Sequence, residues 1–85
     1  MPRYLVERSF ADGLRLDDGA SSALVERNGE LGVTWLQSFV TDDRRTMFCV
    51  YEAPTPEAIR RAARANGLPV DRIAEVRVLD PYPYA

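Results

Sequence analysis

GVTWLQSFVTDDRRTMFCVYEAP, residues 32–54, is the stretch that decides the fold. It holds two runs rich in β-branched and aromatic residues, 33–41 and 46–51, separated by the polar tetrad of residues 42–45. This layout is typical of an antiparallel β-hairpin. The second run is apolar or semi-polar at every position, whereas a strand with one hydrated face alternates between apolar and polar side chains. We therefore expect the second strand of the hairpin to lie in the middle of a sheet that is covered on both faces.

The segments on either side of the hairpin predict two further strands and a first helix. Residues 3–10 and 72–79 alternate in hydropathy and predict a first and a last strand. Residues 19–31 predict a weak amphipathic helix, because Gly29 costs about 1 kcal/mol relative to alanine in a helix interior. The tail of residues 80–85, DPYPYA, cannot extend the last strand, since its two prolines lack the N–H that a sheet ladder needs.

A second helix has the clearest local signal in the chain. Residues 55–57, Thr-Pro-Glu, offer an N-cap hydroxyl, a proline at the first helical position and an acidic side chain in the first turn. One stripe at helical spacing is then formed by Ala58, Ile59, Ala62, Ala63 and Asn66. Gly67 is the expected C-terminal stop. Arg60, Arg61 and Arg64 predict a solvated face, with the acidic residue as an i,i+4 partner.

The resulting order, β-α-β-β-α-β, predicts one ferredoxin-like α+β domain over residues 1–85. In this fold a four-stranded antiparallel sheet carries two helices on one face, and strands one and three lie in the middle. A chain this small buries a limited share of its surface, so a second copy packed sheet to sheet is the simplest cover for the other face. We expect a homodimer through that face. The sequence does not fix the length of the hairpin turn, so it does not determine on which face of the sheet Cys49 lies.

Composition excludes several classes of function. The net charge of −2 and the absence of small residues at the RNA-binding positions of the third strand argue against nucleic acid as a partner. All eleven basic residues are arginines, so a histidine base, a histidine metal ligand and a lysine Schiff base are excluded within the chain. Cys49 is the only cysteine, and no run is long enough to span a membrane. The expected protein is soluble and cytoplasmic.

Five stretches of the chain form motifs that are specific enough for a comparison with known families. They are YLVER at 4–8, GVTW at 32–35, FCVYEAP at 48–54, EAIRR at 57–61 and NGLPVDRI at 66–73. On these motifs the sequence resembles a family of small, largely uncharacterised ferredoxin-like proteins whose best-understood relatives are nickel-binding or nickel-responsive. The resemblance implies the same fold, and nickel as the cofactor of the relatives.

The same resemblance places the relatives' metal-binding histidines in the first strand, the second strand and the second helix. These positions correspond to Glu7, Gln37 and Ala63, none of which is a histidine. Nickel(II) prefers imidazole and thiolate ligands to a lone carboxylate and an amide, so Glu7 and Gln37, even with Cys49, make a poor nickel set. We therefore expect a ligand other than nickel.

The three positions nevertheless predict a small-ligand pocket between the first two strands and the second helix. Its expected lining is Tyr4, Glu7, Trp35, Gln37, Cys49 and Tyr51, with room left by Ala63. The alternative is that the aromatic residues belong to the core or to the dimer interface. The preferred function is a dimeric small-ligand-binding protein. The alternatives are a cofactor-free enzyme with Glu7 as general acid/base, or a residual nickel-binding protein.

Overall fold

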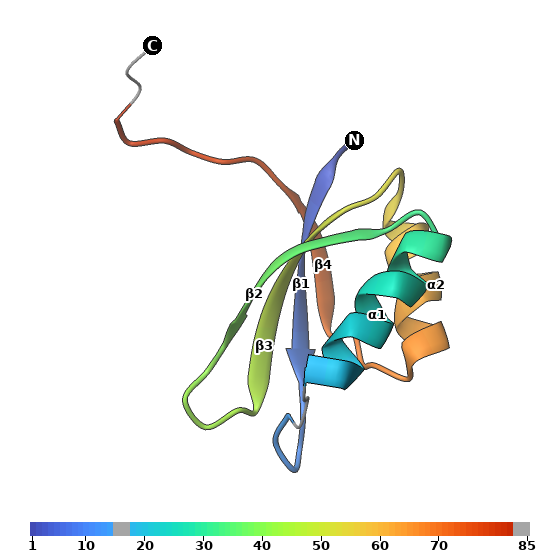
Figure 1. Cartoon of the computed structure of the whole chain (residues 1–85). Coiled ribbons are helices and arrows are strands. Elements are labelled where there is room, and N and C mark those ends of the chain that lie inside the picture. Colours follow the sequence, from blue (N-terminus) through green and yellow to red (C-terminus); the bar gives the residue numbers. More distant parts are fainter. Residues whose placement is uncertain (15–17, 83–85) are drawn as a thin grey trace.

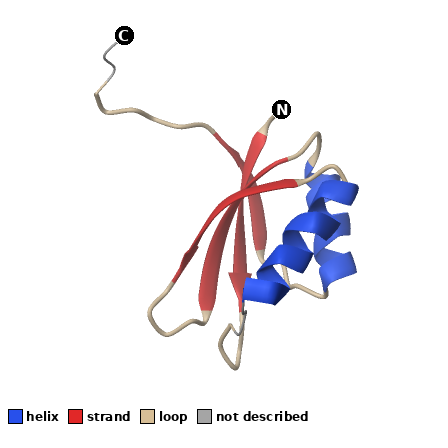
Figure 2. Ribbon diagram, viewed as in Figure 1, coloured by secondary structure: helices blue, strands red, loops and turns tan. Residues whose placement is uncertain are grey.

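The structure, a computed structural model, describes residues 1–14 and 18–82. Its elements are β1 (Arg3–Ser9), α1 (Asp18–Glu30), β2 (Thr34–Val40), β3 (Thr46–Glu52), α2 (Pro56–Asn66) and β4 (Arg72–Val76). The strands form one antiparallel sheet in the order β2-β3-β1-β4. Both helices pack against the same face of this sheet (Figures 1 and 2). The predicted ferredoxin-like fold and the central place of the first and third strands are confirmed.

Helix α2 begins and ends where the sequence predicts. The Thr55 side-chain oxygen accepts a hydrogen bond of 3.2 Å from the Ala58 N–H, and Pro56 is the first helical residue. Gly67 has a φ of 67°, a left-handed conformation in which glycine avoids the strain of a β-carbon. The predicted stripe faces the core, and its buried members are Ala58, Ile59, Ala62 and Ala63.

One polar contact joins the two helices, and an ion pair links two side chains on the outer face of α2. The Asn66 amide nitrogen donates to Asn28 Oδ1 at 2.9 Å, and this contact ties the end of α2 to α1. Glu57 pairs with Arg60 at i,i+3, at 3.7 Å, and not with the predicted i,i+4 residue Arg61. In the described part of the chain, no helix is both long enough and apolar enough to cross a membrane.

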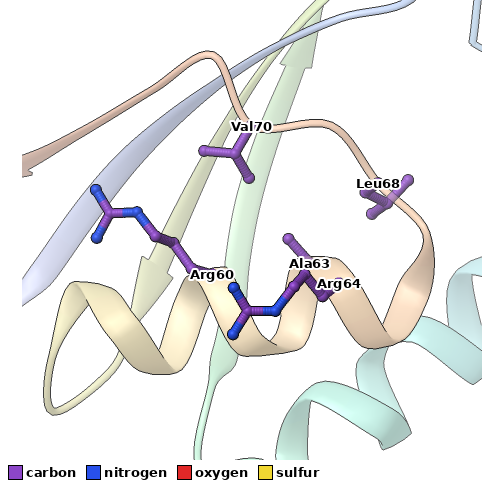
Figure 3. A pocket seen from close by; sticks show the side chains of 5 residues that line it. All are labelled: Arg60, Ala63, Arg64, Leu68 and Val70. Atoms are coloured by element: carbon purple, nitrogen blue, oxygen red, sulfur yellow. The ribbon is translucent and has the colours of Figure 1, made fainter.

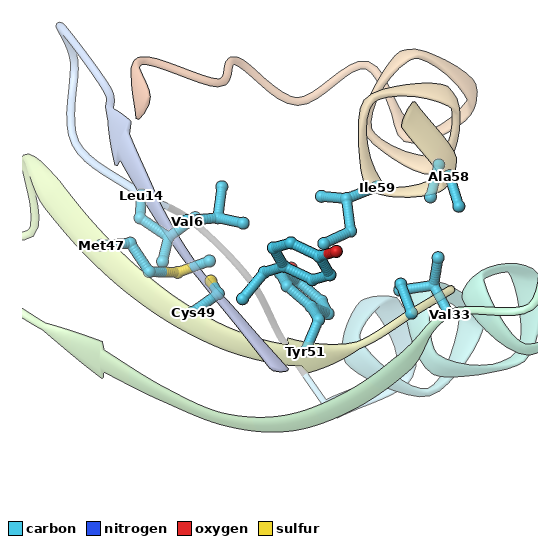
Figure 4. Packing of buried hydrophobic residues seen from close by; sticks show 11 residues of the cluster. Val6, Leu14, Val33, Met47, Cys49, Tyr51, Ala58 and Ile59 are labelled. Atoms are coloured by element: carbon cyan, nitrogen blue, oxygen red, sulfur yellow. The ribbon is translucent and has the colours of Figure 1, made fainter. Parts of the chain in front are cut away.

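The core fills the space between the sheet and the helices (Figure 4). In β1 and β3 every second side chain points to the helices, and the register places Tyr4 opposite Tyr51 and Val6 opposite Cys49. These four side chains are buried together with Ile59 from α2. Cys49 therefore lies on the helix-covered face, which decides the point that the hairpin turn left open.

The last strand is shorter than predicted. The sequence pattern predicts a strand over residues 72–79, but β4 ends at Val76, opposite Arg3 at the start of β1. β1 begins at Arg3, so beyond Val76 the chain has no β1 residue left to pair with. Residues 77–82, here called the C-terminal arm, therefore leave the sheet, and Figure 1 shows them extending away from the domain.

Candidate functional site

The sheet face opposite the helices, here called the open face, is partly apolar. It receives alternate side chains from all four strands, among them Leu5, Glu7, Phe48, Val50, Arg72 and Ala74. Phe48 and Val50 of the central strand β3 are half-buried there, although both helices lie on the other side. β3 was expected to be covered on both faces, but within one chain the helices cover only one of them.

A small cavity lies on the open face between β1 and β4. Its volume is about 150 Å³, and it is lined by Leu5, Glu7, Arg72 and Ala74. The register sets Leu5 opposite Ala74 and Glu7 opposite Arg72, so two apolar walls adjoin two opposite charges. Among the ion pairs of the described residues, none joins Glu7 to Arg72. Both charged groups are therefore available to a ligand. The role of Glu7 as general acid/base stays a prediction.

Four of the predicted pocket residues lie on the helix side of the sheet. Tyr4, Cys49 and Tyr51 are buried in the core. Trp35 packs at the margin of the same core, and its indole N–H donates to the Ser38 hydroxyl at 2.6 Å. On that side these residues contact other core side chains, which is the structural role that the sequence left as the alternative.

The other three predicted pocket residues are divided between the two sides of the sheet. Glu7 and Gln37 lie on the open face, and Gln37 is exposed on the edge strand β2, opposite Val50. Ala63 lies on α2, on the other side of the sheet. The sheet therefore separates Glu7 and Gln37 from the other five predicted pocket residues, which are the core group and Ala63 of α2.

Ala63 lines a second hollow, between α2 and the loop that follows it (Figure 3). This hollow has a volume of about 240 Å³ and is lined by Arg60, Ala63, Arg64, Leu68 and Val70. It lies on the helix layer, so it is separate from the cavity at Glu7.

Arg8 is a buried polar residue that sequence reasoning did not single out. Its side chain is 2% exposed, and it donates to the Pro69 carbonyl oxygen at 2.5 Å and to the Tyr51 hydroxyl at 3.2 Å. The guanidinium carbon lies 5.8 Å from the centre of the Tyr51 ring, whereas Nε has no partner. The signal was present in the sequence, because Arg8 shares its side of β1 with Val6 and Tyr4.

This buried environment also changes the acidity of Tyr51. Removal from water raises the pKa of Tyr51 to about 12, and the neighbouring Cys49 acts in the same direction. The Arg8 guanidinium opposes both effects, because a nearby cation favours the phenolate. Tyr51 is therefore a neutral hydrogen-bonding group of the core at ordinary pH.

Comparisons with known proteins place the chain in a family. Residues 4–76 match the family described as nickel responsive proteins, SCO4226-like. The chain belongs to this family. Among solved structures, the crystal structure of SCO4226 from Streptomyces coelicolor A3(2) is similar to this SCO4226-like chain, with a TM-score of 0.76 and 22% sequence identity over 92% of this chain and 99% of that chain. That likeness confirms the fold. No curated protein matches the chain.

The donor groups of this SCO4226-like chain do not fit a nickel ion. The sequence has no histidine, and the described residues contain no group of three Cys, Asp or Glu side chains placed to hold a metal. The thiol of Cys49 is buried on the helix side, whereas Glu7 and Gln37 lie on the open face. Nickel(II) favours nitrogen and sulfur donors, and the sheet separates the single thiol from the carboxylate and amide oxygens of Glu7 and Gln37.

Proposed function

We propose that this SCO4226-like chain is a homodimeric protein that binds a small organic ligand in the cavity at Glu7. The observation that carries the proposal is the pair of Glu7 and Arg72, which lie opposite one another on β1 and β4 beside two apolar walls and form no ion pair. A carboxylate and a guanidinium set this way suit a small molecule with both a cationic and an anionic group, such as an amino acid-like zwitterion.

A second copy supplies the roof of this cavity. The charged residues of the open face on β1, β3 and β4 are Arg3, Glu7, Glu52 and Arg72. They are two cations and two anions, so the face has no net charge and meets an identical face without repulsion. Between them lie the half-buried apolar side chains of β1 and β3. Packed sheets stand about 10 Å apart, so side chains of the partner would close the open side of the cavity.

The ligand is tested by nuclear magnetic resonance titration of the dimer. A panel of small amines, carboxylates and zwitterions of matched size is added to isotope-labelled protein. Zwitterions should shift the amide signals of Leu5, Glu7 and Ala74 more than amines or carboxylates do. Glu7→Gln should weaken this binding at least about tenfold, because it removes the anionic partner of the ligand.

The matched control is Glu75→Gln, which removes a carboxylate from β4 on the helix side of the sheet. It should leave the affinity unchanged. The proposal is wrong if no member of the panel shifts these signals, or if the two glutamate variants bind equally well.

Nickel provides a separate prediction. Because the chain lacks imidazole and holds its thiol away from the open-face oxygens, Ni²⁺ should not bind tightly. Calorimetric titration of Ni²⁺ into chelator-treated protein should give heat no larger than the buffer control. A saturable exothermic isotherm with a raised thermal midpoint would contradict this.

A further inference from the structure

The hollow between α2 and the loop that follows it, here called the α2 hollow, combines charged and apolar walls. Its volume of about 240 Å³ is that of about eight water molecules in the liquid. Its apolar lining comes from Ala63, Leu68 and Val70, and its charges come from Arg60 and Arg64. Figure 3 shows both arginines extending from α2, while Val70 points toward the helix from the loop. The hollow thus offers a small molecule an apolar surface and two positive charges.

The two arginines lie one turn apart on α2, at i and i+4. Like charges at this spacing repel one another and destabilise a helix. Among the described residues, the ion pair that involves these arginines joins Arg60 to Glu57 at 3.7 Å, and both of its side chains are more than half exposed. Such an exposed pair contributes little. An anion between the two guanidinium groups would therefore relieve their repulsion and compete with a weak ion pair only.

The Arg64 side chain is not needed to complete the end of the helix. An arginine in the last turn of a helix often donates to the final carbonyl groups. Here the Ala63 carbonyl oxygen accepts from the Leu68 N–H at 2.9 Å, and the Arg64 carbonyl oxygen accepts from the Gly67 N–H at 3.2 Å. Within the described part of the chain, the Arg64 guanidinium has no ion pair. It is therefore available to a ligand.

The loop that forms one wall of the α2 hollow is held in place from the sheet. The buried Arg8 side chain donates to the carbonyl oxygen of Pro69, which lies between the two apolar residues of this wall. The Asp71 N–H donates to the Glu7 carbonyl oxygen at 2.8 Å. A wall that is fixed before binding reduces the entropy lost on binding. Arg8 joins no ion pair of the described residues, so it adds a positive charge without an anionic partner next to this wall.

We propose that the α2 hollow binds a small organic acid, with its carboxylate between Arg60 and Arg64 and its apolar part against the apolar lining. Guanidinium groups hold carboxylates by short charge-assisted hydrogen bonds, often two at once. The apolar lining favours such an acid over inorganic phosphate, which has no apolar part to bury. The site lies on the helix layer, so it depends neither on the homodimer nor on the cavity at Glu7.

The site is tested by nuclear magnetic resonance titration of isotope-labelled protein with four probes: isovalerate, isovaleramide, acetate and inorganic phosphate. Isovalerate should shift the amide signals of Ala63, Arg64, Leu68 and Val70 in a saturable way. Its affinity should exceed that of acetate or phosphate about tenfold, because it alone combines a negative charge with an apolar group to bury. Isovaleramide has the same shape without the charge and should not bind. Equal affinity for phosphate would mean a site for charge alone and would overturn the proposal.

Arginine variants supply the matched control. Arg60→Gln and Arg64→Gln should each weaken isovalerate binding at least about tenfold, because each removes one guanidinium partner of the carboxylate. Arg61→Gln removes the same charge from an exposed position of α2 outside the hollow. It should change the affinity by less than about twofold, because solvent and salt screen a charge that does not touch the ligand.

Three outcomes would overturn the proposal. They are the absence of a saturable shift with isovalerate, equal weakening by all three arginine variants, and shifts confined to Leu5, Glu7 and Ala74. The last outcome would assign the carboxylate to the cavity at Glu7, on the other side of the sheet. The position of the shifted signals therefore separates this inference from the proposed function.

Discussion

At the scale of single residues, Arg8 is the largest side chain that is fully buried in the described part of the chain. It donates to the buried Tyr51 hydroxyl of β3 and to the partly buried Pro69 carbonyl oxygen of the loop before β4. A buried cation is costly unless its hydrogen bonds are made, so its contribution lies in satisfying these two oxygen atoms.

Replacement of Arg8 should separate the effect of shape from that of hydrogen bonding. Arg8→Met fills a similar space but leaves the Pro69 oxygen without its donor, and it should lower the free energy of unfolding by about 1–3 kcal/mol. Arg8→Ala adds a cavity and should cost more, about 2–5 kcal/mol. Urea titration measures both, with Arg61→Met on the exposed side of α2 as a control within about 0.5 kcal/mol. If Arg8→Met and Arg8→Ala were equally stable, packing of the Arg8 side chain would not contribute to stability.

Tyr51 predicts a loss of stability in alkaline solution. Its folded-state pKa of about 12 lies above the ordinary value of 10.0, so the unfolded chain loses the phenolic proton first as pH rises. The stabilising effect is therefore complete below pH 10.0 and is lost as pH rises toward about 12. Ultraviolet titration should show one tyrosine ionising later than the others, and Tyr51→Phe should remove that late step. A late step that persists in Tyr51→Phe belongs to another tyrosine.

At the scale of elements, the two helices differ in how strongly the sequence specifies them. α2 has an N-cap, a first-turn proline and a left-handed glycine, and all three take the predicted places. α1 depends more on tertiary contacts, because it contains Gly29 and exposes Val25 on its surface. Its contact with α2 through Asn28 and Asn66 was not predicted, since it joins residues 38 positions apart.

Two glycine substitutions should therefore act in opposite directions. A β-carbon added at Gly29 meets no atom within 4 Å, so Gly29→Ala should stabilise the protein by about 0.5–1 kcal/mol. Gly67 has a φ of 67°, so Gly67→Ala should destabilise it by about 1 kcal/mol although space is available there too. Thermal unfolding of the pair measures the contrast. A shift of the same sign in both variants would mean that backbone conformation does not decide these sites.

At the scale of the whole molecule, the open face predicts a dimer. Sedimentation at micromolar concentration should give twice the chain mass of 9.6 kDa. Val50→Asp places a charge among the half-buried residues of this face and should raise the dimer dissociation constant about a hundredfold. Val25→Asp makes the same change on α1 and should leave the mass unchanged. Dissociation by both variants, or by neither, would place the interface elsewhere.

The site was predicted less well than the fold, for reasons that particular residues make clear. Glu7 lies in a cavity because it faces Arg72 and a small alanine on the neighbouring strand, and such pairings are set only by the sheet register. Cys49 and Glu7 were predicted to share one pocket because the family resemblance made the positions of Glu7, Gln37 and Ala63 converge there. The structure separates them, since a shift of one residue along a strand exchanges its faces.

The sequence by itself determined the order of elements, the caps of α2 and the central place of β1 and β3, because these depend on local backbone preferences and on runs of apolar residues. Only the tertiary structure decided which side of the sheet Cys49 faces, where β4 ends and which residues surround Glu7. These features depend on hydrogen-bonded register between strands far apart in the chain, and no local pattern of residues fixes that register.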